Sequence, residues 1–340
     1  MIKTELLAPR PDAIEKAAGI LRAGGLVAIP TETVYGLAAN ALDGAAVSAI
    51  FAAKGRPQDN PLISHIASMD MLGVVAGRVP PQAQRLAECF WPGPLTMVLP
   101  RGSAVADEVC AGLETAAVRM PSHPVAQAVI RAAGVPLAAP SANLSGSPSP
   151  TTAQDVLADM AGRVPLILDG GACEVGVEST VVSLAGPIPV LLRPGGVTKE
   201  QLEDALGCEV QMAHAVLHGL REGETAASPG MKYKHYAPKA EVTLVKGSFC
   251  AYCNYVAVHA GPGVFALCYE GEEAALCVPA VAYGRKEDAA SQAHALFAAL
   301  RELDRRGACT VYARCPREDG VALAVYNRIL RAAAFRVVEV

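Results

Sequence analysis

The segment at residues 54–62, KGRPQDNPL, has residue types and spacing that suit the binding of a phosphate group. Lys54 and Arg56 place two cations on either side of a single glycine, and Pro57 and Pro61 exclude regular helix. A guanidinium offers a planar fork of donors and an ammonium a point charge, so both can hold phosphate oxygens. The alternative is a solvated loop with incidental charges. A motif this short becomes informative only when other polar stretches converge on it.

Further polar stretches follow apolar runs in the N-terminal part of the chain. Apolar strands are expected at residues 26–30, 62–66, 95–99, 116–120, 135–139, 166–168, 180–184 and 190–193. The polar stretches are residues 31–36, residues 54–65, Arg119, residues 141–149, and Ser179 with Arg193. Ligand sites in open α/β sheets lie beyond the carboxyl ends of strands, so we expect these stretches to line one cleft.

Segments with helical periodicity alternate with the strands and complete an α/β pattern. Helices are expected at residues 11–24, 43–53, 67–76, 80–89, 125–133, 198–206, 248–258, 287–305 and 320–334. Later strands are expected at residues 241–245, 263–268, 277–283, 310–313 and 336–338. The pattern predicts a first α/β domain at 1–207, an interdomain linker at 208–239 and a small α/β domain at 240–340.

The predicted linker contains the aromatic and basic sequence SPGMKYKHYAPK, bounded by Pro229 and Pro238. A linker needs only polarity and proline or glycine, whereas this one adds rings and charge. It is therefore either a stiff spacer whose rings pack on a domain or a segment that covers the cavity.

Composition restricts the class of protein. The chain has 340 residues, 52% of them hydrophobic and 18% charged, which is typical of a globular protein with room for two cores. The formal net charge of -4 argues against a dedicated nucleic-acid binder, which usually carries a basic excess. No apolar run reaches the roughly 18 residues of a membrane span, and the N-terminal MIKTELLAPRPD lacks a signal-peptide core. A cytoplasmic location is expected.

Ten cysteines are scattered along the chain. Cys250 and Cys253 form a lone C-x-x-C, and a four-cysteine zinc site would need a second pair at similar spacing. We therefore expect free thiols in a reducing compartment and no metal site in the protein itself.

Several familiar nucleotide and hydrolase motifs do not occur in the sequence. There is no G-x-x-x-x-G-K-[ST], no G-x-G-x-x-G and no G-x-S-x-G. These absences argue against a P-loop ATPase and a standard dinucleotide enzyme. Lys54, Arg56, Arg119 and Arg193 instead indicate a ligand with more than one anionic group.

Seven stretches together resemble the motifs of the threonylcarbamoyl-AMP synthases. They are PTETVYGLAANA, KGRPQDNPLISH, AAVRMPSHP, APSANLSGSPSPT, GVESTVVSL, LLRPGG and SPGMKYKHYAP. The resemblance covers about residues 11–240, and over 241–340 only length and α/β pattern agree with the two-domain form. It implies a twisted mixed sheet with a large concave cavity, the YrdC-like fold, plus a smaller Rossmann-like α/β domain.

The resemblance also implies a reaction. A nucleotidyltransferase of this family converts L-threonine, bicarbonate and ATP to L-threonylcarbamoyladenylate and pyrophosphate, with Mg²⁺ accompanying the ATP. Other proteins then transfer the threonylcarbamoyl group to an adenosine of tRNA. Binding of tRNA by the synthase itself is expected to be weak or indirect.

The matching motifs carry the family's site residues onto this sequence. Lys54 and Arg56 are implied as catalytic residues. The residues implied around ATP are Arg56, Asn60, Thr115, Ser141, Asn143, Ser149, Arg193, His235 and Tyr236, and the sequence leaves open which of the last two rings touches the nucleotide. Those implied around L-threonine are Thr33, His65, Arg119, the main chain of Ala139, and Ser179.

Two other functions remain open on the sequence. A non-catalytic RNA-binding module would use a basic cavity, although the net charge argues against it. A carbamoyltransferase acting on another acceptor is the second, because related domains occur in hydrogenase maturation. Those proteins usually carry acylphosphatase-like and zinc-finger segments, which this sequence lacks.

Overall fold

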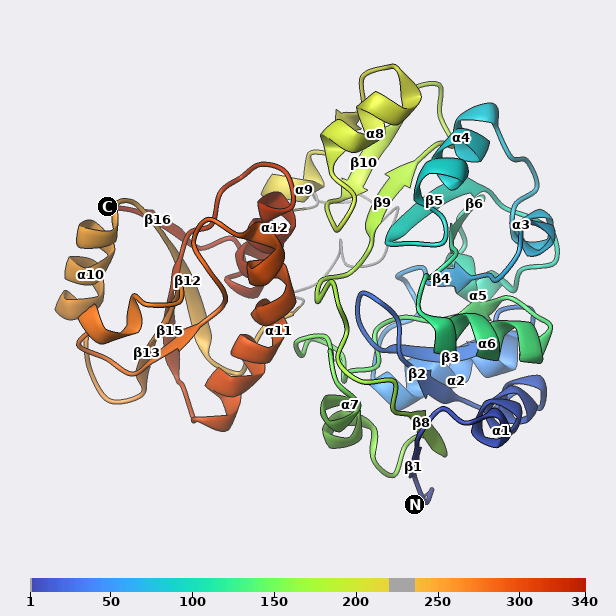
Figure 1. Ribbon diagram of the computed structural model, residues 1–340, viewed down its shortest axis with the longest axis horizontal. Helices are drawn as coiled ribbons and strands as arrows, with labels where there is room; N and C mark the ends of the chain where they lie inside the picture. Colours follow the sequence, from blue (N-terminus) through green and yellow to red (C-terminus); the bar gives the residue numbers. More distant parts are fainter. Residues whose placement is uncertain (1, 220–235) are drawn as a thin grey trace.

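Two α/β units make up the structure, a computed structural model that describes residues 2–219 and 236–340 (Figure 1). The first unit is built on an eleven-stranded sheet of order β1-β8-β2-β3-β7-β4-β6-β5-β9-β10-β11. The second is built on a five-stranded sheet of order β14-β13-β15-β12-β16. Within the described residues, no helix combines the length and the apolar character that crossing a membrane requires.

The first unit follows the predicted alternation of strands and helices. Its strands are β1 (Glu5–Leu7), β2 (Val27–Ile29), β3 (Gly36–Asn40), β4 (Ile63–His65), β5 (Leu95–Pro100), β6 (Thr115–Arg119), β7 (Leu137–Ala138), β8 (Leu166–Leu168), β9 (Thr180–Ser183), β10 (Val190–Arg193) and β11 (Gln211–Met212). Its helices are α1 (Pro11–Arg22), α2 (Gly44–Lys54), α3 (Met69–Val75), α4 (Pro81–Phe90), α5 (Asp107–Cys110), α6 (Pro124–Ala133), α7 (Ala153–Met160), α8 (Lys199–Leu206) and α9 (Ala215–His218).

The first sheet is mixed, as predicted, and its register sets polar side chains side by side. β4 runs parallel to β6, with His65 opposite Arg119, and β5 runs antiparallel to β6, with Thr96 opposite Arg119. β5 also pairs in parallel with β9, and Thr180 of β9 lies opposite the first residue of β5. Three strand ends from distant parts of the sequence therefore meet at one place in the sheet.

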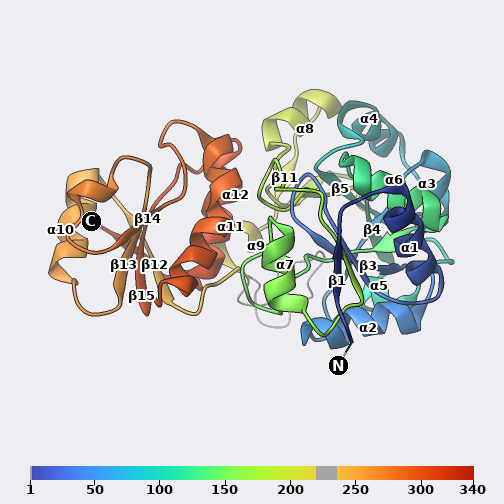
Figure 2. The same ribbon diagram turned by 60° about the horizontal axis from the view of Figure 1, so that its bottom comes forward.

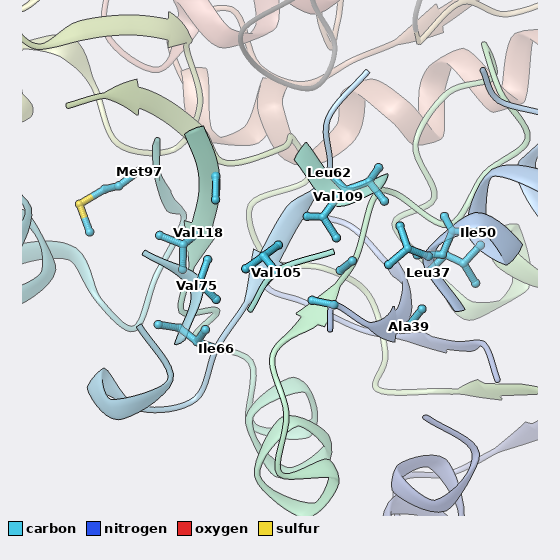
Figure 3. Close-up of a cluster of buried hydrophobic side chains, with 14 of the residues drawn as sticks. Leu37, Ala39, Ile50, Leu62, Ile66, Val75, Met97, Val105, Val109 and Val118 are labelled. Carbon is cyan, nitrogen blue, oxygen red and sulfur yellow. The ribbon is translucent and has the colours of Figure 1, made fainter. Parts of the chain in front are cut away.

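Apolar side chains on the strands and helices of the first unit form the core beneath these strand ends. Leu37, Ile50, Leu62 and Val118 are fully buried and belong to one cluster, part of which Figure 3 shows. Burial of each such side chain contributes about 1.5–3 kcal/mol. The core thus fixes the strands from which the polar loops depart.

The cationic segment follows directly from the end of a helix. α2 ends at Lys54, and Gly55 has a φ of 63° in the left-handed region, where glycine carries no steric penalty. The main-chain N–H of Arg56 then donates to the carbonyl of Phe51 at 3.0 Å. The single glycine between the cations is therefore the helix C-terminal signal.

Strand β3 of the first sheet differs from the expectation. The sequence predicts a polar loop after residue 30, but residues 36–40 return as β3, antiparallel to β2 with Gly36 opposite Ile29. The segment GLAAN has few β-branched or aromatic residues, so its strand propensity is low and pairing in the sheet decides its conformation.

Part of the predicted linker also belongs to the first unit. Residues 211–212 form β11, which pairs in parallel with β10, and α9 follows at residues 215–218. Residues 220–235 lie outside the described part of the chain, and with them His235 and most of the aromatic and basic stretch.

The second unit is a parallel α/β domain. Its elements are β12 (Glu241–Lys246), α10 (Phe249–Val258), β13 (Val264–Cys268), β14 (Ala280–Ala282), α11 (Ala289–Arg305), β15 (Thr310–Arg314), α12 (Ala322–Ala332) and β16 (Val337–Glu339). All its strand pairs are parallel. In both views α10 covers the outer face of the sheet, whereas α11 and α12 lie between the sheet and the first unit (Figures 1 and 2).

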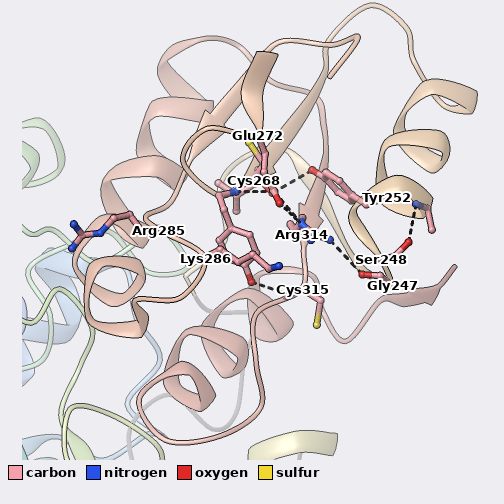
Figure 4. Close-up of polar contacts among 12 residues, drawn as sticks. Gly247, Ser248, Tyr252, Cys268, Glu272, Arg285, Lys286, Arg314 and Cys315 are labelled. Atoms are coloured by element: carbon pink, nitrogen blue, oxygen red, sulfur yellow. Dashed lines mark hydrogen bonds and ion pairs between the residues drawn. The ribbon is translucent and has the colours of Figure 1, made fainter. Parts of the chain in front are cut away.

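A buried ion pair between Arg314 and Glu272 lies at the end of β15 in the second sheet (Figure 4). The Nε of Arg314, at the end of β15, lies 3.0 Å from both carboxylate oxygens of Glu272. Its Cζ lies 5.7 Å from the ring centroid of Tyr252 on α10. Charge pairing and ring contact satisfy this guanidinium and tie α10 to the strand ends.

Candidate functional site

One cavity gathers the polar stretches of the first unit. Its lining consists of Thr31, Thr33, Val34, Gly36, Arg56, Ile63, His65, Arg119, Ala139, Pro140, Ser141, Glu178, Ser179, Arg193 and Tyr236. Thr33, Arg56, Ser141 and Ser179, which come from four separate motifs, therefore face the same space. The polar stretches therefore converge on one cavity, as the interpretation of residues 54–62 as a phosphate-binding segment requires.

Arg119 is held in the cavity by an ion pair and by hydrogen bonds. Its Nη2 lies 2.7 Å from Oε1 of Glu32, and its Nη1 donates to the hydroxyl of Thr33 at 2.9 Å. Burial alone would raise the pKa of Glu32, but the charge and hydrogen bond of Arg119 outweigh it and lower that pKa. The Thr33 hydroxyl also lies 2.9 Å from that of Thr31. The guanidinium is therefore fixed in direction without a ligand.

His65 is neutral in this site. Burial, reinforced by the charge of Arg119, lowers the pKa of His65 to about 3. Its Nδ1 lies 3.2 Å from the carbonyl of Ile63. A carbonyl can only accept, so Nδ1 carries the proton and Nε2 remains an acceptor. The ring can orient a donor in the cavity but does not exchange protons near neutral pH.

Ser179 and Arg193 form a second fixed group. The guanidinium of Arg193 donates through Nε to the carbonyl of Ser179 at 3.0 Å and through Nη2 to its hydroxyl at 3.2 Å. The same hydroxyl lies 2.7 Å from that of Thr96. These contacts hold a buried cation and a hydroxyl together at the ends of β9 and β10.

Lys54 does not line the cavity but holds the loop that carries Ser141. Its side chain is buried, and Nζ donates to the carbonyls of Ser141 at 2.5 Å and Asn143 at 2.6 Å. Burial, together with the charge of Arg56, lowers its pKa well below the ordinary lysine value. The Ser141 hydroxyl in turn donates to Oδ1 of Asn143 at 2.5 Å. Lys54 thus fixes the loop that presents Ser141.

Arg56 lines the cavity beside an amide with no partner of its own. Its Nη2 donates to the carbonyls of Asn60 at 3.2 Å and Pro61 at 3.4 Å. Asn60 is fully buried, and neither its Nδ2 nor its Oδ1 has a hydrogen-bond partner among the described residues. An unsatisfied buried amide is costly, so this loop is suited to gain a polar ligand.

The site residues expected from the sequence fall into three groups: those that line the cavity, those that do not, and one outside the described residues. Nine line the cavity: Thr33, Arg56, His65, Arg119, Ala139, Ser141, Ser179, Arg193 and Tyr236. Five others, Lys54, Asn60, Thr115, Asn143 and Ser149, do not line it. Thr115 begins β6, and Ser149 is buried with its hydroxyl bonded to Glu178. His235 lies outside the described residues.

Two buried acids of the site escaped the sequence analysis. Glu32 pairs with Arg119, and Glu178 accepts from Ser149 and from Arg328 of the second unit. Each is the single acid in an otherwise uncharged motif, TETVYG and GVESTVV. A lone carboxylate beside several cations is a signal that could have indicated both pairs.

The side chains of the described residues offer no dedicated metal centre. Within residues 2–219 and 236–340, no group of three histidine, cysteine, aspartate or glutamate side chains is placed to hold a metal ion. The two buried acids already pair with arginines. A divalent ion in the cavity would therefore depend on oxygen atoms of its ligand and on water.

Two family models cover most of the chain. Residues 19–195 match the one described as "Telomere recombination", and residues 197–334 match the one described as "Threonylcarbamoyl-AMP synthase, C-terminal domain". With the mixed sheet and its cationic cavity, these matches define a nucleotidyl-transferring α/β enzyme that carries an additional C-terminal domain.

Relatives of nearly the same length make the assignment specific. Threonylcarbamoyl-AMP synthase of Pyrococcus abyssi is 46% identical over 96% of this chain and 96% of its own, and that of Bacillus subtilis is 45% identical over 99% and 97%. The crystal structure of P. abyssi Sua5 complexed with L-threonine superposes with a TM-score of 0.91 at 44% identity, covering 100% of this chain and 99% of that one. The chain belongs to the threonylcarbamoyl-AMP synthase family, in its two-domain form.

The Glu32–Arg119 pair predicts a specific acid dependence of stability. The pKa of Glu32 is lower in the folded chain than in the unfolded chain, so the pair stabilises above about pH 4.5 and is lost as the pH falls through the folded value. We expect Glu32→Gln to lower the free energy of unfolding by about 3 kcal/mol at neutral pH, and by less in acid. Chemical denaturation at several pH values measures this difference.

Glu15→Gln is the matched control for that measurement. Glu15 makes an exposed ion pair with Arg22, which contributes little to stability at any pH. Equal behaviour of the two variants would show that the Glu32–Arg119 pair is not a stabilising contact.

The close approach of Gly195 to the main chain of residues 178–180 allows a steric test of the segment that carries Ser179. A Cβ at residue 195 would lie 2.2 Å from the main-chain nitrogen of Thr180 and 2.6 Å from the carbonyl oxygen of Glu178. We expect Gly195→Ala to displace this segment, at a cost of about 1–3 kcal/mol, and to impair activity. Gly196→Ala meets only side chains, the nearest at 3.2 Å, and should be milder. Equal unfolding midpoints and rates for the two variants would contradict the close approach.

Proposed function

We propose that this enzyme forms threonylcarbamoyl-AMP and pyrophosphate from L-threonine, bicarbonate and ATP within the cavity described above. The convergence of Thr33, Arg56, Ser141 and Ser179 on one space is the observation that carries the proposal. It supports a single chamber in which an amino acid and a triphosphate lie together. The L-threonine in the structure of the P. abyssi relative is consistent with such a chamber.

The group around Arg119 is proposed to bind L-threonine. The guanidinium can direct a fork of donors at the carboxylate, because Glu32 and Thr33 already fix its orientation. The acceptor Nε2 of His65 can orient the amine, and the Ser179 hydroxyl and Ala139 main chain complete the set. Burial of the site favours the uncharged form of the amine, which attacks bicarbonate.

The triphosphate is proposed to bind at the other cationic groups. Arg56 and Arg193 neutralise phosphate charge, and Ser141 donates from the loop that Lys54 holds. Asn60, Thr115, Asn143, Ser149 and one of His235 and Tyr236 remain the predicted nucleotide contacts. The predicted cover of the cavity by the linker at 208–239 falls mostly outside the described residues, and in its described part Tyr236 is buried in the cavity lining, which supports it.

The chemistry asks for positioning rather than covalent catalysis. The threonine nitrogen attacks the carbon of bicarbonate, and water leaves as the carbamate forms. A carbamate oxygen then attacks the α-phosphorus, and the bond to the pyrophosphate oxygen breaks. The protein orients these groups and stabilises charge that develops on the phosphates.

Mg²⁺ is proposed to enter with ATP. The cavity provides cations and hydroxyls, and its acids are already paired, so phosphate oxygens and water would supply most metal ligands. Bound Mg²⁺ would supply additional charge neutralisation on the triphosphate. The cytoplasmic location and the proteins that pass the threonylcarbamoyl group to tRNA remain predictions.

The reaction predicts a strict dependence on both small substrates. Purified protein should release pyrophosphate from ATP only when L-threonine and bicarbonate are both present. A coupled assay for pyrophosphate, with threonine or bicarbonate omitted in turn, measures this. Equal release without threonine would reject the proposed function.

Arg56 and Lys54 should differ in how their loss affects the enzyme. Arg56→Ala removes a phosphate contact, so we expect the rate to fall about 10²- to 10³-fold with little change in stability. Lys54→Met leaves the carbonyls of Ser141 and Asn143 without a donor, so it should lower the free energy of unfolding by about 1–3 kcal/mol as well as the rate. Denaturation and steady-state rates on both proteins separate the two roles. A normal rate in Arg56→Ala would contradict phosphate binding.

A further inference from the structure

Arg328 of α12, in the second unit, is fully buried against the first unit. Its Nε donates to Oε2 of Glu178 at 2.7 Å, and its Nη2 lies 3.3 Å from the main-chain carbonyl of the same residue. Its Nη1 donates to the carbonyl of Pro194 at 3.0 Å. One guanidinium thus binds two segments of the first unit at once.

The two carbonyls that Arg328 contacts lie next to residues that line the cavity. Glu178 precedes Ser179, and Pro194 follows Arg193. Fixing these carbonyls fixes the Glu178–Ser179 and Pro194–Gly195 peptide planes, and these planes adjoin the residues that carry the Ser179 hydroxyl and the Arg193 guanidinium. Arg328 itself does not line the cavity, so its effect on a ligand must pass through these neighbours.

Glu178 connects Arg328 to the cavity, because it pairs with Arg328 and belongs to the cavity lining. The carboxylate of Glu178 lines the cavity, pairs with Arg328 through Oε2, and accepts from the hydroxyl of Ser149 through Oε1. A fully buried guanidinium is costly without such a partner. The ring of Tyr236, which also lines the cavity, lies 5.4 Å from Cζ of Arg328. The carboxylate therefore joins the second unit to two predicted ligand-binding segments.

We propose that Arg328 is a positioning residue for the synthase reaction and that the second unit is a structural part of the active site. The guanidinium holds the Glu178–Ser179 and Pro194–Gly195 peptides in the arrangement that binds L-threonine and the triphosphate. This inference rests on the proposed function for the identity of the two ligands. It assigns a role to a domain in which the sequence alone shows no catalytic motif.

A second contact between the units provides a matched comparison. Arg301 of α11 pairs with Asp159 of α7 at 2.8 Å and donates to the carbonyl of Pro148 at 2.6 Å. Both side chains of this pair are largely buried, as in the Arg328–Glu178 pair. None of Arg301, Asp159 and Pro148 lines the cavity. Loss of this pair weakens the same interface without touching the cavity lining.

The test uses Arg328→Gln, Arg328→Lys and Arg301→Gln in the full chain. For each protein, pyrophosphate release gives kcat and KM for threonine and ATP, calorimetry gives the Kd for L-threonine, and thermal unfolding gives Tm. We expect Arg328→Gln to raise the KM for both substrates by about tenfold or more, because small displacements at such a site have large effects. Arg301→Gln should change the KM for L-threonine by less than about twofold, even where its Tm falls equally. The comparison uses threonine because Pro148 adjoins Ser149, a predicted nucleotide contact.

Arg328→Lys keeps the proposal testable if the glutamine variant does not fold. An ammonium can retain the ion pair with Glu178 but cannot also reach the carbonyl of Pro194, so Tm should fall less than in Arg328→Gln while KM for ATP still rises. Unaltered KM and Kd in folded Arg328→Lys and Arg328→Gln would overturn the proposal. Equal increases in the KM for L-threonine in Arg301→Gln would also overturn it, since they would indicate a general effect of the interface. Failure of the proposed function is distinguishable, because the unaltered protein would then release pyrophosphate without threonine.

Discussion

Burial of cations is the constraint on which the rest of this structure depends. Lys54, Arg119 and Arg193 are each buried, and a buried charge is costly unless neighbouring groups satisfy it. Each therefore has its own partners: two carbonyls for Lys54, Glu32 and Thr33 for Arg119, and Ser179 for Arg193. The positive charges are consequently oriented before any substrate arrives.

Such preorganisation suits a reaction that needs little covalent help from the protein. In the proposed arrangement, the charge that grows on the phosphates during adenylate formation would meet the donors of Arg193, which do not have to reorient. The same partners explain why the strands are arranged as they are, since the register that places His65 and Thr96 opposite Arg119 brings three strand ends to one point. The fold and the chemistry follow from one arrangement of the sheet.

The second unit is built in the same way, because its buried Arg328 donates hydrogen bonds to atoms of the first unit and to its neighbour Asn327. The interface is thus more than apolar packing between two domains. It inserts a cation behind the carboxylate of Glu178, in the segment that also presents Ser179. Stability of the interface and geometry of the cavity depend on the same contacts.

Much of the site could be predicted from the sequence, since polar residues at the ends of apolar runs do converge in an α/β sheet. Arg56, Ser141 and Ser179 were recognisable by type and position, and all line the cavity. The supporting position of Lys54 was not, because a cation beside Arg56 gives no indication of which one faces the ligand. Partners far apart in the chain, such as Glu178 and Arg328, could not be paired without the fold. β3 was missed because its small residues carry little strand propensity.

The most direct test is a crystal structure of this protein with L-threonine and a non-hydrolysable ATP analogue bound together. The account predicts the threonine carboxylate at Arg119 and the phosphates at Arg56 and Arg193, with both ligands in the cavity and the Arg328–Glu178 pair intact. Threonine or phosphates bound outside this cavity would contradict it.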